Sequence, residues 1–97
     1  MAKTGPITRE IAESLAIDAL GFLAQDDERL GRFLAASGMG PEMIRKAAAD
    51  PSFLAGVLDH IVSDEPLLIA FAQHASIDPR VVERAQALLV GEAPEVP

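Results

Sequence analysis

The stretch from Arg9 to Gln25 reads REIAESLAIDALGFLAQ and indicates the fold class. Its apolar residues recur with the 3.6-residue period of a helix that faces a core. The apolar side carries Ala12, Leu15, Ala16, Ala19, Leu20, Phe22 and Leu23, and the polar side carries Glu10, Ser14, Asp18, Gly21 and Gln25. Thr8 stands where an N-cap residue is expected. We therefore predict an amphipathic helix over residues 9–25.

The other helices are predicted from their end signals. Acids followed by proline, as in Asp50-Pro51 and Asp78-Pro79, are typical of helix starts. Gly38 is a natural left-handed residue at a helix end. The expected helices after the first cover about residues 27–37, 41–49, 51–63, 65–75 and 79–91. No stretch alternates apolar and polar residues as a half-buried strand does.

The segment from Leu67 to Ala72 is apolar on every side of a helix. Such helices are usually buried all round, so the helix over 65–75 is expected at the centre of the fold. The fold class is therefore predicted as all-α, a compact bundle of five to six helices. We expect a single helical domain over 8–91, a flexible N-terminus over 1–7 and a flexible C-terminal tail over 92–97.

An internal repeat offers a second description of the bundle. A shift of 38 positions places Asp26 over Asp64, Phe33 over Phe71 and Pro41 over Pro79, as well as Leu20 over Leu58 and Leu30 over Leu68. The bundle would then consist of two three-helix units, roughly 14–49 and 52–87. Chance agreement between caps and leucines is the alternative, because helical proteins reuse both.

Composition narrows the classes of function. The 97 residues carry 15 acids and 8 bases, for a net charge of −7, and include no cysteine, tryptophan or tyrosine. Disulfides and thiolate metal sites are thus excluded, and an acidic chain repels nucleic acid at long range. The N-terminus has no apolar run after Lys3, and the longest uncharged apolar run is far shorter than a membrane span. We expect a cytoplasmic protein without membrane attachment.

The sequence predicts no catalytic residue, no cofactor and no metal. His60 and His74 each precede an acid by four residues, Asp64 and Asp78, but that spacing alone does not bring four ligands together. The acids at 26–28 and 64–65 lie at predicted helix starts, where they cap and complement the helix dipole. Nucleophile and phosphate-loop motifs are missing from the sequence.

A helix-turn-helix is the sharpest functional pattern. Leu34, Gly38 and Ile44 have the spacing of its first-helix contact, turn glycine and second-helix contact. The surrounding segment is basic in an acidic chain. The nucleic-acid-binding residues of this alternative would be Arg29, Arg32, Arg45 and Lys46. Against it, the second helix begins with Glu42 and carries no Asn, Gln, Ser or Thr to contact base edges.

Four segments resemble a small bacterial family, a domain of unknown function similar to DUF3572. They are EIAESLAIDALGFLA at 10–24, followed by Asp27, LGRFLAASG at 30–38, DPSFL at 50–54 and VLD at 57–59. The resemblance covers about residues 7–90 and implies a short all-helical protein standing alone as one domain. It implies no activity and transfers no functional residue.

The function expected from the sequence is a small protein-interaction or adaptor module without catalytic activity. The partner would be another protein or a second copy of the chain, because strongly apolar helices occur here without a catalytic motif. The nucleic-acid binder using the 29–46 segment is the alternative.

Overall fold

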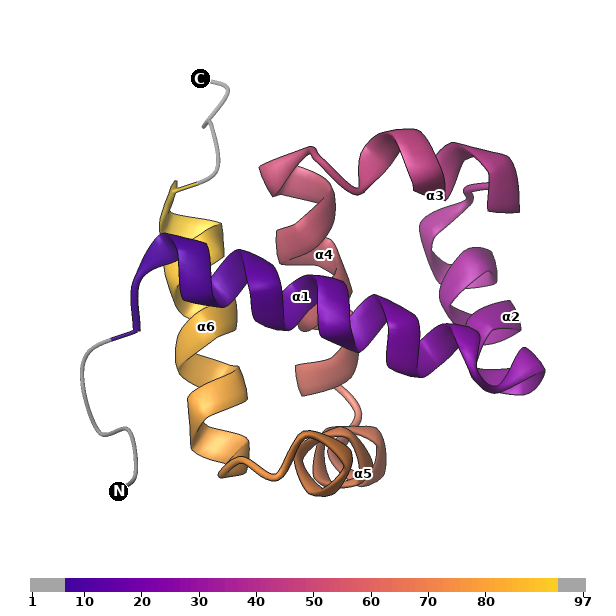
Figure 1. Cartoon of the computed structure of the whole chain (residues 1–97). Coiled ribbons are helices and arrows are strands. Elements are labelled where there is room, and N and C mark those ends of the chain that lie inside the picture. Colours follow the sequence, from indigo (N-terminus) through magenta and orange to yellow (C-terminus); the bar gives the residue numbers. More distant parts are fainter. Residues whose placement is uncertain (1–6, 93–97) are drawn as a thin grey trace.

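The computed structural model describes residues 7–92, apart from the side chains of Pro41 and Glu92. Of the segments expected to be flexible, 1–7 and 92–97, residues 1–6 and 93–97 lie outside the described residues. Six α-helices follow one another, and Figure 1 shows their arrangement. Their bounds are α1 Arg9–Ala24, α2 Asp27–Ser37, α3 Pro41–Ala47, α4 Pro51–Val62, α5 Glu65–Ala75 and α6 Pro79–Glu92. The predicted all-α bundle is confirmed, and α3 ends two residues earlier than expected.

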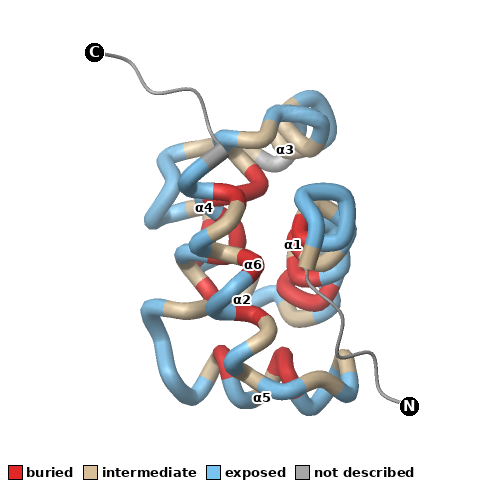
Figure 2. Tube along the Cα trace, turned by 90° about the vertical axis from the view of Figure 1, so that its left-hand side faces the viewer, coloured by how far each residue is buried: buried red, intermediate tan, exposed pale blue. Residues whose placement is uncertain are grey.

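The centre of the bundle is formed by α1, α4 and α6, each of which packs extensively against the other two. In Figure 2 the buried residues gather along the sides on which these helices meet. The core cluster comprises Ala12, Ala16, Ala19, Phe22, Leu23, Phe33, Leu54, Ala55, Val57, Leu58, Ile61, Leu68, Phe71, Val82, Ala85 and Leu89. Small alanines on α1 allow α4 and α6 to approach it closely, which explains why its apolar stripe faces this centre.

The prediction that the helix over 65–75 is central is wrong. Helix α5 closes one end of the bundle (Figure 1) and contacts α4, α6 and α1 along one face. Its opposite face, with Glu65, Ile69 and Gln73, is exposed. An apolar residue on that face, Ile69, keeps 39% of its surface accessible. The all-round apolar pattern failed here because burial depends on the number of neighbouring helices, which composition does not report.

Local capping fixes the helix starts. The side chains of Thr8, Asp26, Asp50 and Asp64 accept hydrogen bonds from backbone N–H groups in the first turns of α1, α2, α4 and α5. The carboxylate of Asp78 accepts from the Arg80 backbone N–H at 2.8 Å. Asp26 and Asp64 thus act as the N-caps that the sequence predicts. Each such cap contributes about 1 kcal/mol relative to alanine.

The helix bounds agree with the 38-residue shift. The shift places both ends of α2 on the ends of α5. It also places the last residue of α1 on the last residue of α4, and the first residue of α3 on the first residue of α6. The left-handed residues also coincide, because Gly38 has φ 74° after α2 and Ser76 has φ 59° after α5. The two units differ in their third helix. Helix α6 packs between α1 and α4, whereas α3 is half as long and contacts the core cluster through Ile44.

Within residues 7–92, no helix is long and apolar enough to cross a membrane.

Candidate functional site

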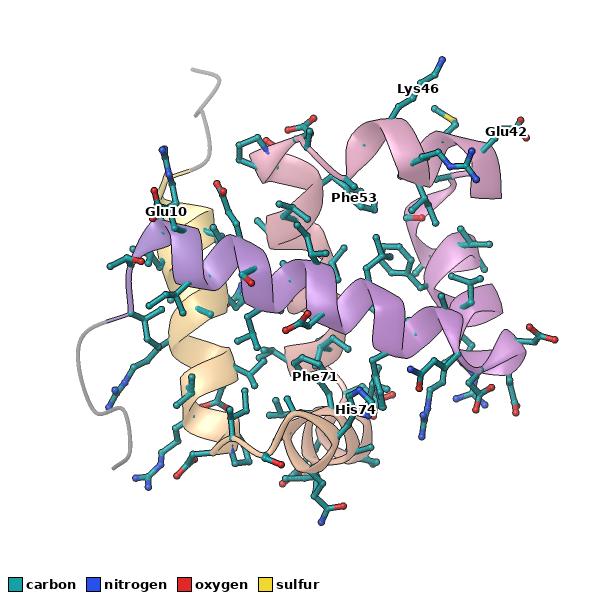
Figure 3. All side chains as sticks on the ribbon, viewed as in Figure 1. Glu10, Glu42, Lys46, Phe53, Phe71 and His74 are labelled. Carbon is teal, nitrogen blue, oxygen red and sulfur yellow. The ribbon has the colours of Figure 1, made fainter. Side chains whose placement is uncertain are left out.

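An open hollow of about 360 Å³ lies between α2 and α4. We call it the ring groove. Its lining residues are Phe33, Ala36, Ser37, Phe53, Gly56, Asp59, His60 and Ser63. The small residues Ala36 and Gly56 leave the space, and three rings border it. Figure 3 shows Phe53 on the part of α4 that lies near α3 and α2.

The rings of the groove hold one another in place. Phe33 is buried, and its centroid lies 5.9 Å from that of Phe53 and 5.2 Å from that of His60. Both contacts are edge-on, the arrangement that the quadrupoles of aromatic rings favour. Phe53 and His60 are only half-buried, so the groove presents fixed ring surface to solvent.

The contact between Phe33 and His60 has a counterpart in the other unit with the roles exchanged, although the rings there are tilted rather than edge-on. The 38-residue shift carries Phe33 onto Phe71 and Phe22 onto His60, and Phe22 and Phe71 lie 5.5 Å apart. Helix α2 therefore contacts α4 through Phe33 and His60, as α5 contacts α1 through Phe71 and Phe22. Two units related by an approximate twofold axis would show this reciprocity.

The two units differ at the place where the groove lies. His74 of α5 lies over Phe22, with centroids 5.0 Å apart, and Figure 3 shows His74 and Phe71 on the side of α5 toward α1. The shift carries Ala36 of α2 onto His74. Where one unit places an imidazole over a ring, the other places a methyl group beside His60. The missing ring leaves the hollow between α2 and α4.

A second hollow, of about 210 Å³, adjoins the ring groove at His60. We call it the basic end. It is lined by Arg29, Arg32, His60, Asp64, Pro66 and Leu67. The guanidinium of Arg29 lies 4.7 Å from the centre of the Phe22 ring. Arg32 donates to Glu28 at 3.0 Å in an exposed pair, which is the kind of pair that contributes little stability.

The four basic residues of the helix-turn-helix alternative do not gather on one surface feature. Arg29 and Arg32 line the basic end of the groove. Arg45 and Lys46 are exposed in the last turn of α3, and Figure 3 shows Lys46 projecting away from the bundle. The turn between the two helices does have the expected form, because Gly38 adopts the left-handed conformation. Helix α3 has seven residues, begins at Pro41 and carries the acid Glu42 in its first turn.

The two histidines serve different ring contacts. His60 lies against Phe33 and His74 lies against Phe22. Among residues 7–92, no group of three or more His, Asp or Glu side chains is placed so that it could hold a metal ion. The acids Asp26 and Asp64 accept from backbone N–H groups, so both are engaged in capping.

Large apolar side chains at the surface are spread over the bundle. Ile11 and Ile17 on α1, Met43 on α3, Ile69 on α5 and Val90 on α6 are exposed. They come from four helices, so they do not by themselves define a docking face. The ring groove is the stronger candidate, because it combines a hollow with aromatic walls.

The ring groove was not predicted from the sequence. Its aromatic residues lie on two helices, and their meeting depends on how α2 packs beside α4. A signal was nevertheless present, because the 38-residue shift aligns Phe22 with His60 and His74 with Ala36. That alignment indicates two ring contacts and one missing ring.

Fold and site together define an all-α bundle of six helices with a groove on one side. The chain belongs to the family described as protein of unknown function (DUF3572), whose family model matches residues 9–92. The match covers all of α1 to α6 and confirms the resemblance noted in the sequence. Neither the curated proteins nor the solved structures provide a match to the chain.

Proposed function

We propose that the protein is a small protein-interaction module without catalytic activity, which holds a segment of a partner protein in the ring groove. The observation that carries the proposal is the hollow beside the edge-on pair of Phe33 and His60. Binding hot spots are typically apolar or aromatic side chains that enter such a hollow. We take the cytoplasm as the compartment in which the module works.

The size of the groove sets what kind of docking it supports. A volume of about 360 Å³ accepts one large side chain, with helices α2 and α4 as its rims. Burial of one such anchor contributes about 2 kcal/mol, whereas a micromolar complex needs about 8 kcal/mol. The partner segment therefore also contacts the rims, as an amphipathic helix does when it lies in a groove.

The placement of the ionisable groups supports a non-catalytic role. General acid–base catalysis needs a group that can reach a substrate and exchange a proton. Asp26, Asp50 and Asp64 are engaged as N-caps. Both imidazoles pack against phenyl rings. All of these groups therefore make structural contacts in the bundle. Those contacts support the proposal that the protein has no catalytic activity.

A helix-turn-helix nucleic-acid binder is the second candidate. The observation in its favour is the left-handed Gly38 turn before α3, with Arg45 and Lys46 exposed at the end of that helix. It predicts that duplex DNA binds with an affinity that falls steeply with salt. This candidate is tested by titrating duplex DNA with the wild type and with an Arg45→Ala/Lys46→Ala variant, followed by electrophoresis or fluorescence. The titrations are run between about 50 and 200 mM salt, the range over which affinity from phosphate contacts is lost. Binding that is absent at low salt removes this candidate.

Site-specific photo-crosslinking tests the interaction module. A benzophenone amino acid replaces Ser37 or Ser63, which line the ring groove, or Ile11, which is exposed elsewhere on α1. We expect irradiation in living cells to join a protein to positions 37 and 63 and not to position 11. Equal crosslinking from all three positions would show contact without a preferred surface and would contradict the proposal.

A further inference from the structure

The partner's chemistry follows from the groove's two ends, and this inference rests on the proposed function. The approximate twofold relation supplies a template for the apolar end. In one unit the His74 ring covers Phe22 at 5.0 Å. In the other unit the equivalent place beside His60 is bordered by Ala36. A side chain that approaches this place meets the same kind of surface that holds His74 in the first unit, so a planar ring suits it.

The basic end supplies charge. Arg29 and Arg32 both border it, and no hydrogen bond joins the guanidinium of Arg29 to another residue within 7–92. Arg32 is paired with Glu28 in an exposed bridge, which a competing carboxylate can replace at small cost. Asp64 borders the same hollow and accepts from the Leu67 N–H, so part of its charge is already engaged.

The ring groove also carries one acid on α4. Asp59 lines the ring groove, and its Oδ1 accepts from Nε2 of Gln86 at 3.4 Å. A carboxylate placed near Asp59 would be repelled, whereas one placed toward Arg29 and Arg32 would be attracted. The charges therefore favour a carboxylate beside Arg29 and Arg32 over one beside Asp59. The ring of His60 borders both hollows, so the two contacts lie within reach of one helical turn of a partner.

We propose that the ring groove binds a partner segment that carries an aromatic side chain and, within about one helical turn, a carboxylate. The ring enters the hollow beside His60 and Ala36, and the carboxylate accepts from Arg29 and Arg32. A second copy of the chain is a poorer occupant, because two chains of net charge −7 repel each other at long range.

Peptide-display selection against the full chain tests this proposal. A library of random helical peptides is selected on the wild type, and the best binders are titrated by fluorescence against four variants. Ala36→His fills the hollow with the side chain found at the equivalent position, and Ala35→His places the same side chain on an exposed neighbour that does not line the groove. Arg32→Glu reverses the charge at the basic end, and Arg45→Glu makes the same change on α3.

We expect the selected peptides to share an aromatic residue and an acid three or four positions apart. Ala36→His should abolish their binding, while Ala35→His should leave it within about twofold. Arg32→Glu should weaken binding roughly tenfold, which corresponds to the loss of one charge-assisted hydrogen bond. Arg45→Glu should have little effect. Replacing the peptide's acid by its amide should weaken binding to the wild type and should not weaken binding to Arg32→Glu, where the amide no longer faces a like charge.

The failures separate the two proposals. Peptides that bind through an aromatic residue, need no acid and lose affinity with Ala36→His would overturn the inference about charge and leave the interaction module standing. Basic peptides would overturn it as well. Two outcomes would show that the ring groove is not the binding site and would overturn both proposals. The selected peptides could bind Ala36→His as tightly as the wild type, or selection on the wild type could enrich no peptides beyond those enriched on Ala36→His.

Discussion

The imidazole of His60 lies edge-on against the ring of Phe33, with their centroids 5.2 Å apart. Phe22 and Phe71 make the equivalent contact between the other two helices at 5.5 Å. The pair from α1 and α5 is covered by His74, whereas the pair from α4 and α2 has Ala36 at the equivalent position. The difference between Ala36 and His74 is therefore one of the side-chain differences between the two units that leave the groove open, together with Gly56, which the shift aligns with Asp18.

Filling the groove should not destabilise the protein. Ala36→His adds an imidazole where a hollow of about 360 Å³ is open, so no packed neighbour has to move. Alanine-to-histidine replacement on a helix costs about 0.6 kcal/mol in propensity at either position 35 or 36. We expect the free energies of unfolding of Ala36→His and Ala35→His, measured by urea denaturation, to agree within about 0.5 kcal/mol. A clearly larger loss for Ala36→His would mean that the hollow is occupied by the protein itself.

The two equivalent phenylalanines should differ in their contribution to stability. Phe71 is fully buried and packs against Phe22, and His74 covers Phe22 in turn. Phe33, in contrast, borders the open groove. Phe71→Ala leaves a closed cavity and should cost about 4 kcal/mol, near the middle of the range for such changes. Phe33→Ala widens a space that water already reaches, and should cost roughly 1 kcal/mol less. Chemical denaturation of both variants checks the order, and equal losses would contradict the asymmetry of the two units.

The two left-handed helix ends give a matched pair of substitutions. Gly38 has φ 74° and Ser76 has φ 59°. Both lie in the left-handed region, which is unfavourable for residues other than glycine. Gly38→Ala should destabilise the protein by about 1 kcal/mol, and Ser76→Gly should stabilise it by up to about 1 kcal/mol. Space does not limit the first change, because an added Cβ at Gly38 meets no atom within 4 Å. Thermal unfolding of the two variants should therefore shift in opposite directions, and shifts of the same sign would argue against backbone strain at these ends.

The start of α6 should respond to acid. A side-chain hydrogen bond from Arg80 holds the pKa of Asp78 below its ordinary value of 3.8, and the Arg80 backbone N–H adds to the effect. Since the folded pKa is the lower one, the carboxylate's contribution to stability is fully present above pH 3.8 and is lost as the pH falls through the folded pKa. NMR titration of the Asp78 carboxyl should show this lowered pKa, and Arg80→Ala should raise it toward 3.8. An Asp78 pKa unchanged by Arg80→Ala would contradict the assigned cause.

The helix ends could be predicted from the sequence because their causes are local. Each cap depends on a residue and the backbone one turn away, as Asp26 shows for α2. The left-handed end of α2 at Gly38 was likewise foreseeable from glycine alone. The 38-residue shift was visible as an alignment of caps, and the helix bounds now agree with it.

The centre of the fold could not be predicted in the same way. The run at 67–72 is the most apolar in the chain, yet α5 buries only Leu68, Phe71 and Ala72. The small alanines of α1 lie deeper because both α4 and α6 pack against the face of α1 that carries them. Burial is a property of the assembled helices, so composition along one helix cannot rank the helices by depth.

Whether the ring groove holds a partner protein can be tested by comparing three forms of the protein. Tagged wild type, Ala35→His and Ala36→His are captured from their native cells with nuclease present, and the bound proteins are quantified by mass spectrometry. We predict a stoichiometric protein recovered with the wild type and with Ala35→His, and lost with Ala36→His. A partner retained equally by all three proteins, or recovered by none of them, would contradict the proposal that the ring groove holds a partner protein.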